Sequence, residues 1–280
     1  MSSCKRPTWL LLCLLNPLPA AAAGYVLGIG GEVDNTDGRA LTAFGDFGVG
    51  ENTWLSTAAG LSETDGALGG FETVFGDVGI DHWFKPLGFR IAGAYWGDSD
   101  LLDSTDVRAS MYYRDDNATL SLDYEHRRFD FIFRTLLLDQ QRKVEFFANG
   151  WGMSTRFKMS DSLSLFANGM QYEYSRDIRI EPRADLLTLL SSSRLNVMNS
   201  LLDYRVSGGV EYRFGLRSID IAASSWKTAV DQGSVDSYGI GFLTPLTDRT
   251  DVEFRLAYDI SEDYGDSIVF SAYLYYFGGM

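Results

Sequence analysis

Acid–base chemistry in this chain could rest on two histidines, His82 and His126. His82 directly follows Asp81 in the sequence. His126 lies between Glu125 and Arg127. Each histidine could pair with a carboxylate as a catalytic base. Neither one lies in a local nucleophile motif, so an interface or turn position is the favoured interpretation. The sequence therefore predicts no catalytic residue.

Two acidic segments, Asp98–Asp106 and Asp34–Gly38, carry the oxygen ligands that divalent cations prefer. The shorter segment lacks the spacing and the terminal glutamate of a calcium loop. Solvated turns are the favoured interpretation of both segments, although cation bridging to lipopolysaccharide phosphates is an alternative function. We expect no resident metal ion and no cofactor.

A larger set of charged residues follows an alternating pattern. Between Val252 and Ile260, apolar residues occupy every second position, and Glu253, Arg255 and Asp259 lie between them. A period of two puts these charges on one face of a β-strand. In a barrel wide enough to hold water, that face lines the lumen. The predicted lumen residues are Arg108, Arg114, Asp123, Glu125, Arg134, Glu145, Arg205, Glu211, Arg213, Asp220, Glu253, Arg255 and Asp259. Because the two signs nearly balance, we expect weak charge selectivity.

Strand length separates a membrane barrel from a soluble β-sandwich. The alternating runs have the length that a tilted strand needs to cross a bilayer, about ten residues. Strands of soluble sheets average about five to six residues. Aromatic residues gather near the expected strand ends, where interface girdles would lie. A closed barrel also leaves no backbone group unpaired in lipid. We therefore predict an all-β protein that forms a closed antiparallel transmembrane β-barrel.

The N-terminal segment has the pattern of a secretory signal peptide over residues 1–23. Lys5 and Arg6 precede the apolar run Trp9–Leu15, and Ala21–Ala23 offers a small-residue cleavage site. The expected mature domain, 24–280, contains no cysteine and so has no disulfide framework. The formal net charge of the whole chain is −14, which disfavours binding to nucleic acid.

The connections between the predicted strands fall into short turns at one end and longer acidic loops at the other. The longer loops are expected at 34–38, 62–66, 97–104, 231–234 and 261–266. One long loop is predicted at about 175–203, with a short helix after Pro182. The alternation slips near His126–Arg128, which indicates a bulge or a turn. Two strands over 117–158 give a total of about fourteen and four give about sixteen, and we prefer fourteen within a range of about twelve to sixteen.

These features resemble those of Gram-negative outer-membrane β-barrels of the porin-like kind. The likeness covers the whole of 24–280 and is architectural. The last strand, Asp266–Phe277, resembles the family's C-terminal recognition strand, with Tyr275 and Phe277 at the aromatic positions. The resemblance implies a location in the cell outer membrane, contact with its lipid and lipopolysaccharide, and insertion by the barrel assembly machinery. An oligomer is also compatible with the resemblance.

Three functions fit such a barrel. The leading hypothesis is a passive channel for small solutes, which needs a polar lumen and no covalent chemistry. A barrel enzyme acting on lipid or peptide would need one of the histidines beside a serine or an aspartate at the outer rim. A structural or adhesion barrel would have a lumen blocked by paired charges.

The sequence predicts where the protein fractionates. Because its strands alternate and no apolar run reaches about eighteen residues, we expect recovery with the outer membrane. We also expect migration on gels to change on heating, as the closed barrel unfolds. Cell fractionation and unheated electrophoresis test this. Recovery as a soluble periplasmic protein would contradict the barrel.

Overall fold

A computed structural model describes residues 24–66, 69–98, 102–135, 140–176, 201–230, 232–263 and 265–279. The predicted signal peptide, 1–23, lies outside the described residues. So does most of the predicted long loop with its helix, at 177–200. Among the residues that are described, no helix is long and apolar enough to cross a membrane.

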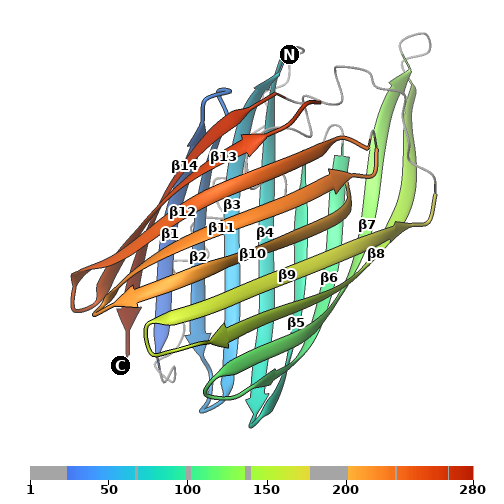
Figure 1. The fold of residues 1–280 in the computed structure, drawn as a ribbon. Helices are drawn as coiled ribbons and strands as arrows, with labels where there is room; N and C mark the ends of the chain where they lie inside the picture. The colour runs from blue at the N-terminus through green and yellow to red at the C-terminus, as the bar shows by residue number, and fades with distance from the viewer. Residues whose placement is uncertain are drawn as a thin grey trace.

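Fourteen antiparallel strands close into one barrel, as predicted (Figure 1). Each strand pairs with its neighbours in the sequence, and the ring is closed where β1 pairs with β14 from Tyr25–Gly278 to Asp34–Val269. The strands are β1 (Tyr25–Asp34), β2 (Arg39–Gly48), β3 (Thr53–Gly66), β4 (Gly69–Phe84), β5 (Leu87–Asp98), β6 (Leu102–Arg114), β7 (Ala118–Thr135), β8 (Gln140–Lys158), β9 (Leu163–Tyr174), β10 (Leu202–Phe214), β11 (Arg217–Thr228), β12 (Ser234–Thr247), β13 (Thr250–Ile260) and β14 (Ser267–Gly278).

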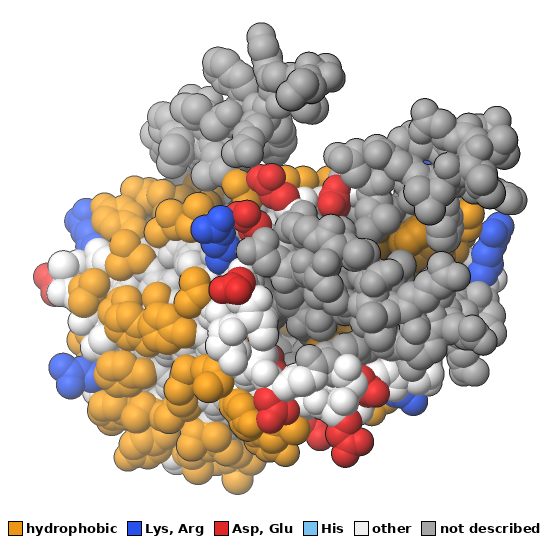
Figure 2. Space-filling view, turned by 90° about the horizontal axis from the view of Figure 1, so that it is seen from above, with side chains coloured by type: hydrophobic (Ala, Val, Ile, Leu, Met, Phe, Trp, Pro, Cys, Tyr) orange, Lys and Arg blue, Asp and Glu red, His pale blue; other side chains and the backbone are white. Residues whose placement is uncertain are grey.

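The alternation of side chains separates an apolar outer face from a polar inner face. On β13, the outward side chains of Phe254, Leu256, Tyr258 and Ile260 remain 41–49% exposed, as expected for a surface that meets lipid. The intervening Arg255 forms ion pairs inside the barrel. Seen from above, hydrophobic side chains cover the flank of the barrel and acidic ones lie around its rim (Figure 2).

Strand β7 corrects the expectation of a bulge or turn at His126–Arg128. Its pairing with β8 runs without a register shift from Ala118 to Thr135. The polarity of the two faces is exchanged instead. Beyond Arg127 the inward residues become Phe129 and Phe131, which are 0% and 7% exposed. The outward Arg128 forms an ion pair with Glu145 of β8. Because this part of the hairpin projects past its neighbours (Figure 1), its outer face can carry charge.

The two ends of the barrel differ less than predicted. At the end where β14 finishes, called the turn end, connections have two to four residues. At the other end, the loop end, they have two to six residues, apart from the one between Tyr174 and Leu202. The predicted loop at 62–66 belongs to β3, and most of the one at 97–104 belongs to β5 and β6. Lengthened hairpins therefore take the place of two of the five expected acidic loops. Shorter turns mark the turn end as periplasmic.

Aromatic side chains form outward girdles near both ends. At the turn end the rings of His82 and Phe89 lie 5.7 Å apart. At the loop end the rings of Tyr124 and Trp151 lie 4.7 Å apart. Such rings suit the boundary between acyl chains and headgroups. Other aromatic residues near strand ends face inward and are buried, namely Trp96, Tyr172 and Trp226.

The orientation of β11 can be tested with one substitution on each face. Ile221 is outward and 62% exposed, whereas Ala222 faces the lumen. An arginine facing lipid near the bilayer midplane costs about 2–4 kcal/mol, and far less in a wet lumen. We expect Ile221→Arg to impair folding into vesicles much more than Ala222→Arg. Unfolding in urea, followed by gel mobility, measures the difference. Equal effects would contradict the assigned faces.

Candidate functional site: the barrel lumen

The structure brings most of the predicted lumen residues to the inner wall. Arg108 lines a cavity of about 310 Å³ between β2 and β6. Five others line a second cavity, of about 430 Å³, bounded by β8–β14 and β1; these are Arg205, Glu211, Asp220, Arg255 and Asp259. Inward positions on β6, β7, β10 and β13 are taken by Arg114, Asp123, Glu125, Arg213 and Glu253.

Two predicted lumen residues remain, Glu145 and Arg134. Glu145 faces outward, opposite Asp130, and forms a 2.6 Å ion pair with Arg128. The prediction failed because it assigned every charge in an alternating run to the lumen. That rule holds only where the outer face meets lipid. Arg134 belongs to β7, but its side chain lies outside the described ones.

Several inward charges were missed by the sequence analysis. They are Glu32, Asp46, Asp77, Asp81, Arg90, Asp106, Arg127 and Arg156. The signal that could have found them is the alternation itself. It is weakened by glycines such as Gly28, Gly150 and Gly152, which carry no side chain to mark a face.

The lumen ion pairs run along the wall. Arg156 Nη1 of β8 lies 2.5 Å from Glu211 Oε2 of β10. Arg108 of β6 pairs with Asp77 of β4, skipping one strand in the same way. Among the described side chains, no ion pair joins opposite walls. The charges therefore neutralise their neighbours and do not lock the two sides of the barrel together.

A buried polar cluster stiffens one part of this wall. Arg127 Nε lies 3.1 Å from Glu125 Oε1 and 3.9 Å from Asp106 Oδ2. The guanidinium lies 4.8 Å above the ring of Tyr172, whose hydroxyl donates to Glu125 at 2.6 Å. Ser104 donates to Asp106 at 2.5 Å. A buried network of ion pairs and hydrogen bonds of this kind holds its members in one geometry.

Above this cluster, the inner wall at the loop end is apolar along one arc. We call this arc the apolar collar. Its members come from β5 to β12 and from the positions beside these strands, namely Trp96, Leu102, Phe129, Phe131, Phe146, Ala148, Tyr172, Leu201, Leu202, Trp226, Val230 and Val235. The rings of Phe129 and Phe146 are stacked at 4.9 Å. On the remaining arc the wall is polar, with Ser271 donating to Glu32 at 3.1 Å and Ser62 bonded to Thr73.

Aromatic rings on the inner wall lie over glycines of the neighbouring strands. A Cβ added at Gly28 would collide with the ring of Phe44, and one at Gly150 would lie 2.6 Å from the ring of Tyr172. Glycine permits this close approach because it has no side chain. These rings therefore lie close against the wall.

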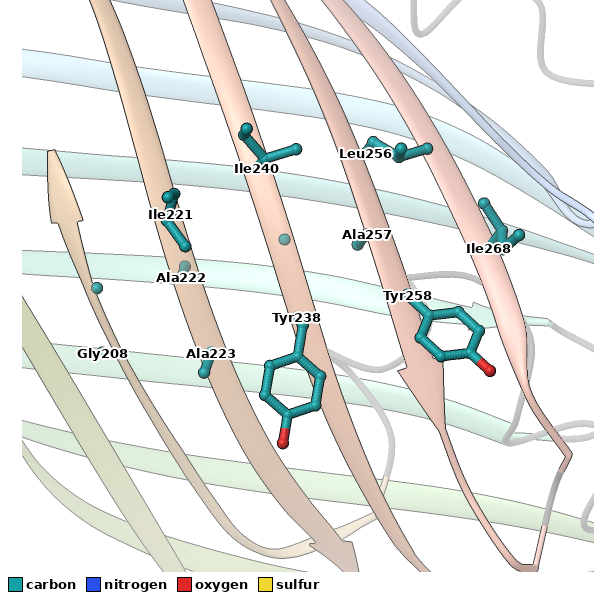
Figure 3. A pocket seen from close by; sticks show the side chains of 12 residues that line it. Gly208, Ile221, Ala222, Ala223, Tyr238, Ile240, Leu256, Ala257, Tyr258 and Ile268 are labelled. Carbon is teal, nitrogen blue, oxygen red and sulfur yellow. The ribbon is translucent and has the colours of Figure 1, made fainter. Parts of the chain in front are cut away.

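A third hollow, of about 550 Å³, lies on the outer wall. Figure 3 shows Tyr238, Ile240, Leu256 and Tyr258 on this face, with Gly208 beside them. Its outward side chains are apolar apart from the tyrosine hydroxyls. The hollow thus belongs to the surface that meets acyl chains, and the polar site is inside.

Neither histidine belongs to the lumen. His82 Nδ1 lies 2.8 Å from the hydroxyl of Thr53 on the outer face, and His126 Nδ1 lies 2.8 Å from Asn149 Oδ1. The predicted cation segment at Asp34 is a closed turn, in which the carboxylate accepts from the backbone of Thr36 and Gly38. Within the described ranges, no group of three or more potential ligands could hold a metal ion.

Comparison with known proteins identifies the architecture. No family model and no curated protein matches the sequence. The solved structure of the CymD monoaromatic hydrocarbon channel matches over 90% of this chain and 88% of its own, with a TM-score of 0.57 and 11% identity. This chain has the fold of an outer-membrane channel barrel. The KdgM porin has a lower TM-score of 0.45 and 9% identity, over 90% of this chain and 98% of its own. The NanC porin has a TM-score of 0.49 and 8% identity, over 89% of this chain and 98% of its own. The closed barrel and its apolar outer face fit the cell outer membrane.

The packing of ring over glycine makes a prediction about stability. Gly150→Val would push the Tyr172 ring away from the wall and break its hydrogen bond to Glu125. Overpacking of this kind costs about 1–3 kcal/mol. The matched control is Gly76→Ala on β4, where an added Cβ meets nothing within 4 Å. Urea unfolding of the refolded barrels measures both. A Gly150→Val barrel as stable as Gly76→Ala would contradict the role of the ring.

Proposed function

We propose that this protein is a passive channel for small hydrophilic solutes. The observation that carries the proposal is the arrangement of the lumen charges. They pair along the wall, as Arg156 does with Glu211, and leave polar cavities of about 430 and 310 Å³ inside the barrel. Charged side chains beside water-filled space provide a path for solutes without covalent chemistry. The name of CymD, a monoaromatic hydrocarbon channel, supports the channel part of this proposal, whereas the hydrophilic solute is inferred from the lumen charges alone.

The two alternative functions receive less support. An enzyme would need a histidine beside a nucleophile, whereas the described partners of His82 and His126 are Thr53 and Asn149. A structural barrel would have its lumen closed by ion pairs from wall to wall, and the described pairs join strands no more than two apart. We therefore infer that the protein is not an enzyme.

The proposal includes the partners expected of such a barrel. Outward Ile268, Phe270, Leu274 and Tyr276 give β14 an apolar face toward lipid. We propose that the barrel assembly machinery inserts the chain through this strand. Tyr275, expected to belong to the recognition pattern, faces inward and donates to Glu253 at 2.6 Å. The outward aromatic for such recognition is therefore Tyr276. Contact with lipopolysaccharide belongs to the same proposal.

Conductance across planar bilayers tests the channel. We expect refolded protein to give stable open steps. Arg156→Gln removes a cation from the lumen and should shift the reversal potential in a KCl gradient toward cation selectivity. Arg128→Gln is the matched control, because Arg128 pairs equally closely with a glutamate but on the outer face. It should leave the reversal potential unchanged. Absence of conductance, or equal shifts in both variants, would contradict the proposal.

A further inference from the structure

The larger lumen cavity holds charges that its own ion pairs leave uncompensated. Two of its arginines are neutralised, Arg156 by Glu211 at 2.5 Å and Arg255 by Asp220 at 3.1 Å. A third arginine, Arg205, lines the same cavity. Among the described residues, none forms an ion pair with Arg205, and its buried Nε has no hydrogen-bond acceptor. The cavity therefore contains a guanidinium that is available to an anion.

The side chains opposite Arg205 make the binding of an anion to its guanidinium more favourable. In the sheet, Arg205 lies directly opposite Met170 of β9 and Trp226 of β11. Neither neighbour offers a carboxylate or a carbonyl oxygen from its side chain. A guanidinium in such surroundings gains most from a planar anion such as a carboxylate, which accepts two of its hydrogen bonds.

A carboxylate of the protein lies on the other side of the cavity. Asp259 of β13 lines it, and its one described side-chain partner is the hydroxyl of Ser267, at 3.4 Å. No described cation pairs with Asp259. Glu32, also in the lining, accepts from Ser271 at 3.1 Å. The cavity thus has an available cation on β10 and an available anion on β13.

A row of hydroxyl groups joins these two charges. Ser207 follows Arg205 by two residues on β10 and lies opposite Ser224 of β11. Ser224 lies opposite Ser237 of β12, which lies opposite Asp259. All three serines line the cavity, and no described residue bonds to their hydroxyls. Each hydroxyl can both donate and accept a hydrogen bond, so the row can pair with peptide groups.

We propose that this row is a binding site for short zwitterionic peptides of about two or three residues. Strands β10 and β13 are three spacings apart, about 14 Å. The Arg205 and Asp259 side chains shorten the gap between the charges, and an extended peptide adds about 3.5 Å per residue. The carboxylate of the peptide pairs with Arg205 and its ammonium group with Asp259. This inference rests on the proposed channel, since the peptide reaches the row through the lumen.

Three matched probes test the proposal on the wild-type full-length barrel. Glycylglycine carries both charges, N-acetylglycylglycine only the carboxylate, and glycylglycinamide only the ammonium group. Equilibrium binding in detergent is followed by tryptophan fluorescence, because Trp226 lines the cavity. We expect glycylglycine to bind about tenfold more tightly than either probe, since a hydrogen-bonded charge contributes this much or more. Equal binding of all three would overturn the proposal, and so would equally tight binding of either singly charged probe.

Two variants assign the ends of the peptide. Arg205→Gln should remove the preference for glycylglycine over glycylglycinamide, and Asp259→Asn the preference over N-acetylglycylglycine. Arg128→Gln, on the outer face, should preserve both preferences. Unchanged preferences in the first two variants would overturn the site. Where a variant does not fold, the comparison of the three probes on the wild type decides whether the peptide site exists.

The same protein in planar bilayers separates this proposal from the channel. Ionic conductance without a preference for glycylglycine would overturn the peptide site and leave the channel standing. A preference in detergent without conductance would support the site and overturn the channel.

Discussion

The structure depends on one constraint, the pairing of every backbone N–H and C=O group that lies in lipid. An isolated sheet edge would leave such groups without partners at a cost of several kcal/mol each. Pairing of β1 with β14, from Tyr25–Gly278 to Asp34–Val269, removes both edges. Closure then fixes an inside and an outside, and the period of two along each strand distributes apolar and charged residues between them.

Inside, the protein must hold many charges without filling the barrel. Ion pairs between near strands, such as Arg108 with Asp77, keep the charged groups against the wall. Rings placed over glycines, such as Phe44 over Gly28, keep bulky side chains there as well. Both arrangements hold side chains against the wall, so that they do not pack across the lumen. The buried group around Arg127 and the apolar collar then distinguish one arc of the loop end from the other.

Much of the fold could be predicted from the sequence, because lipid imposes a simple rule on each strand. On Val252–Ile260 the rule identified the strand, its faces and the lumen positions of Arg255 and Asp259. It failed on β7 and β8, where the hairpin leaves the bilayer and Glu145 faces water from the outer side. Which charges pair could not be predicted, because partners such as Arg156 and Glu211 lie 55 positions apart.

The short reach of the ion pairs has a consequence for how such a barrel can change over evolution. Arg156 pairs with Glu211, two strands away on β10. Arg255 likewise pairs with Asp220, two strands away on β11. The paired charges are therefore neutralised locally, within units of about three strands. A hairpin exchanged or duplicated together with its neighbour carries its compensating charges with it. The lumen lining is in this sense modular, and one arc can acquire a new solute preference while the others retain theirs.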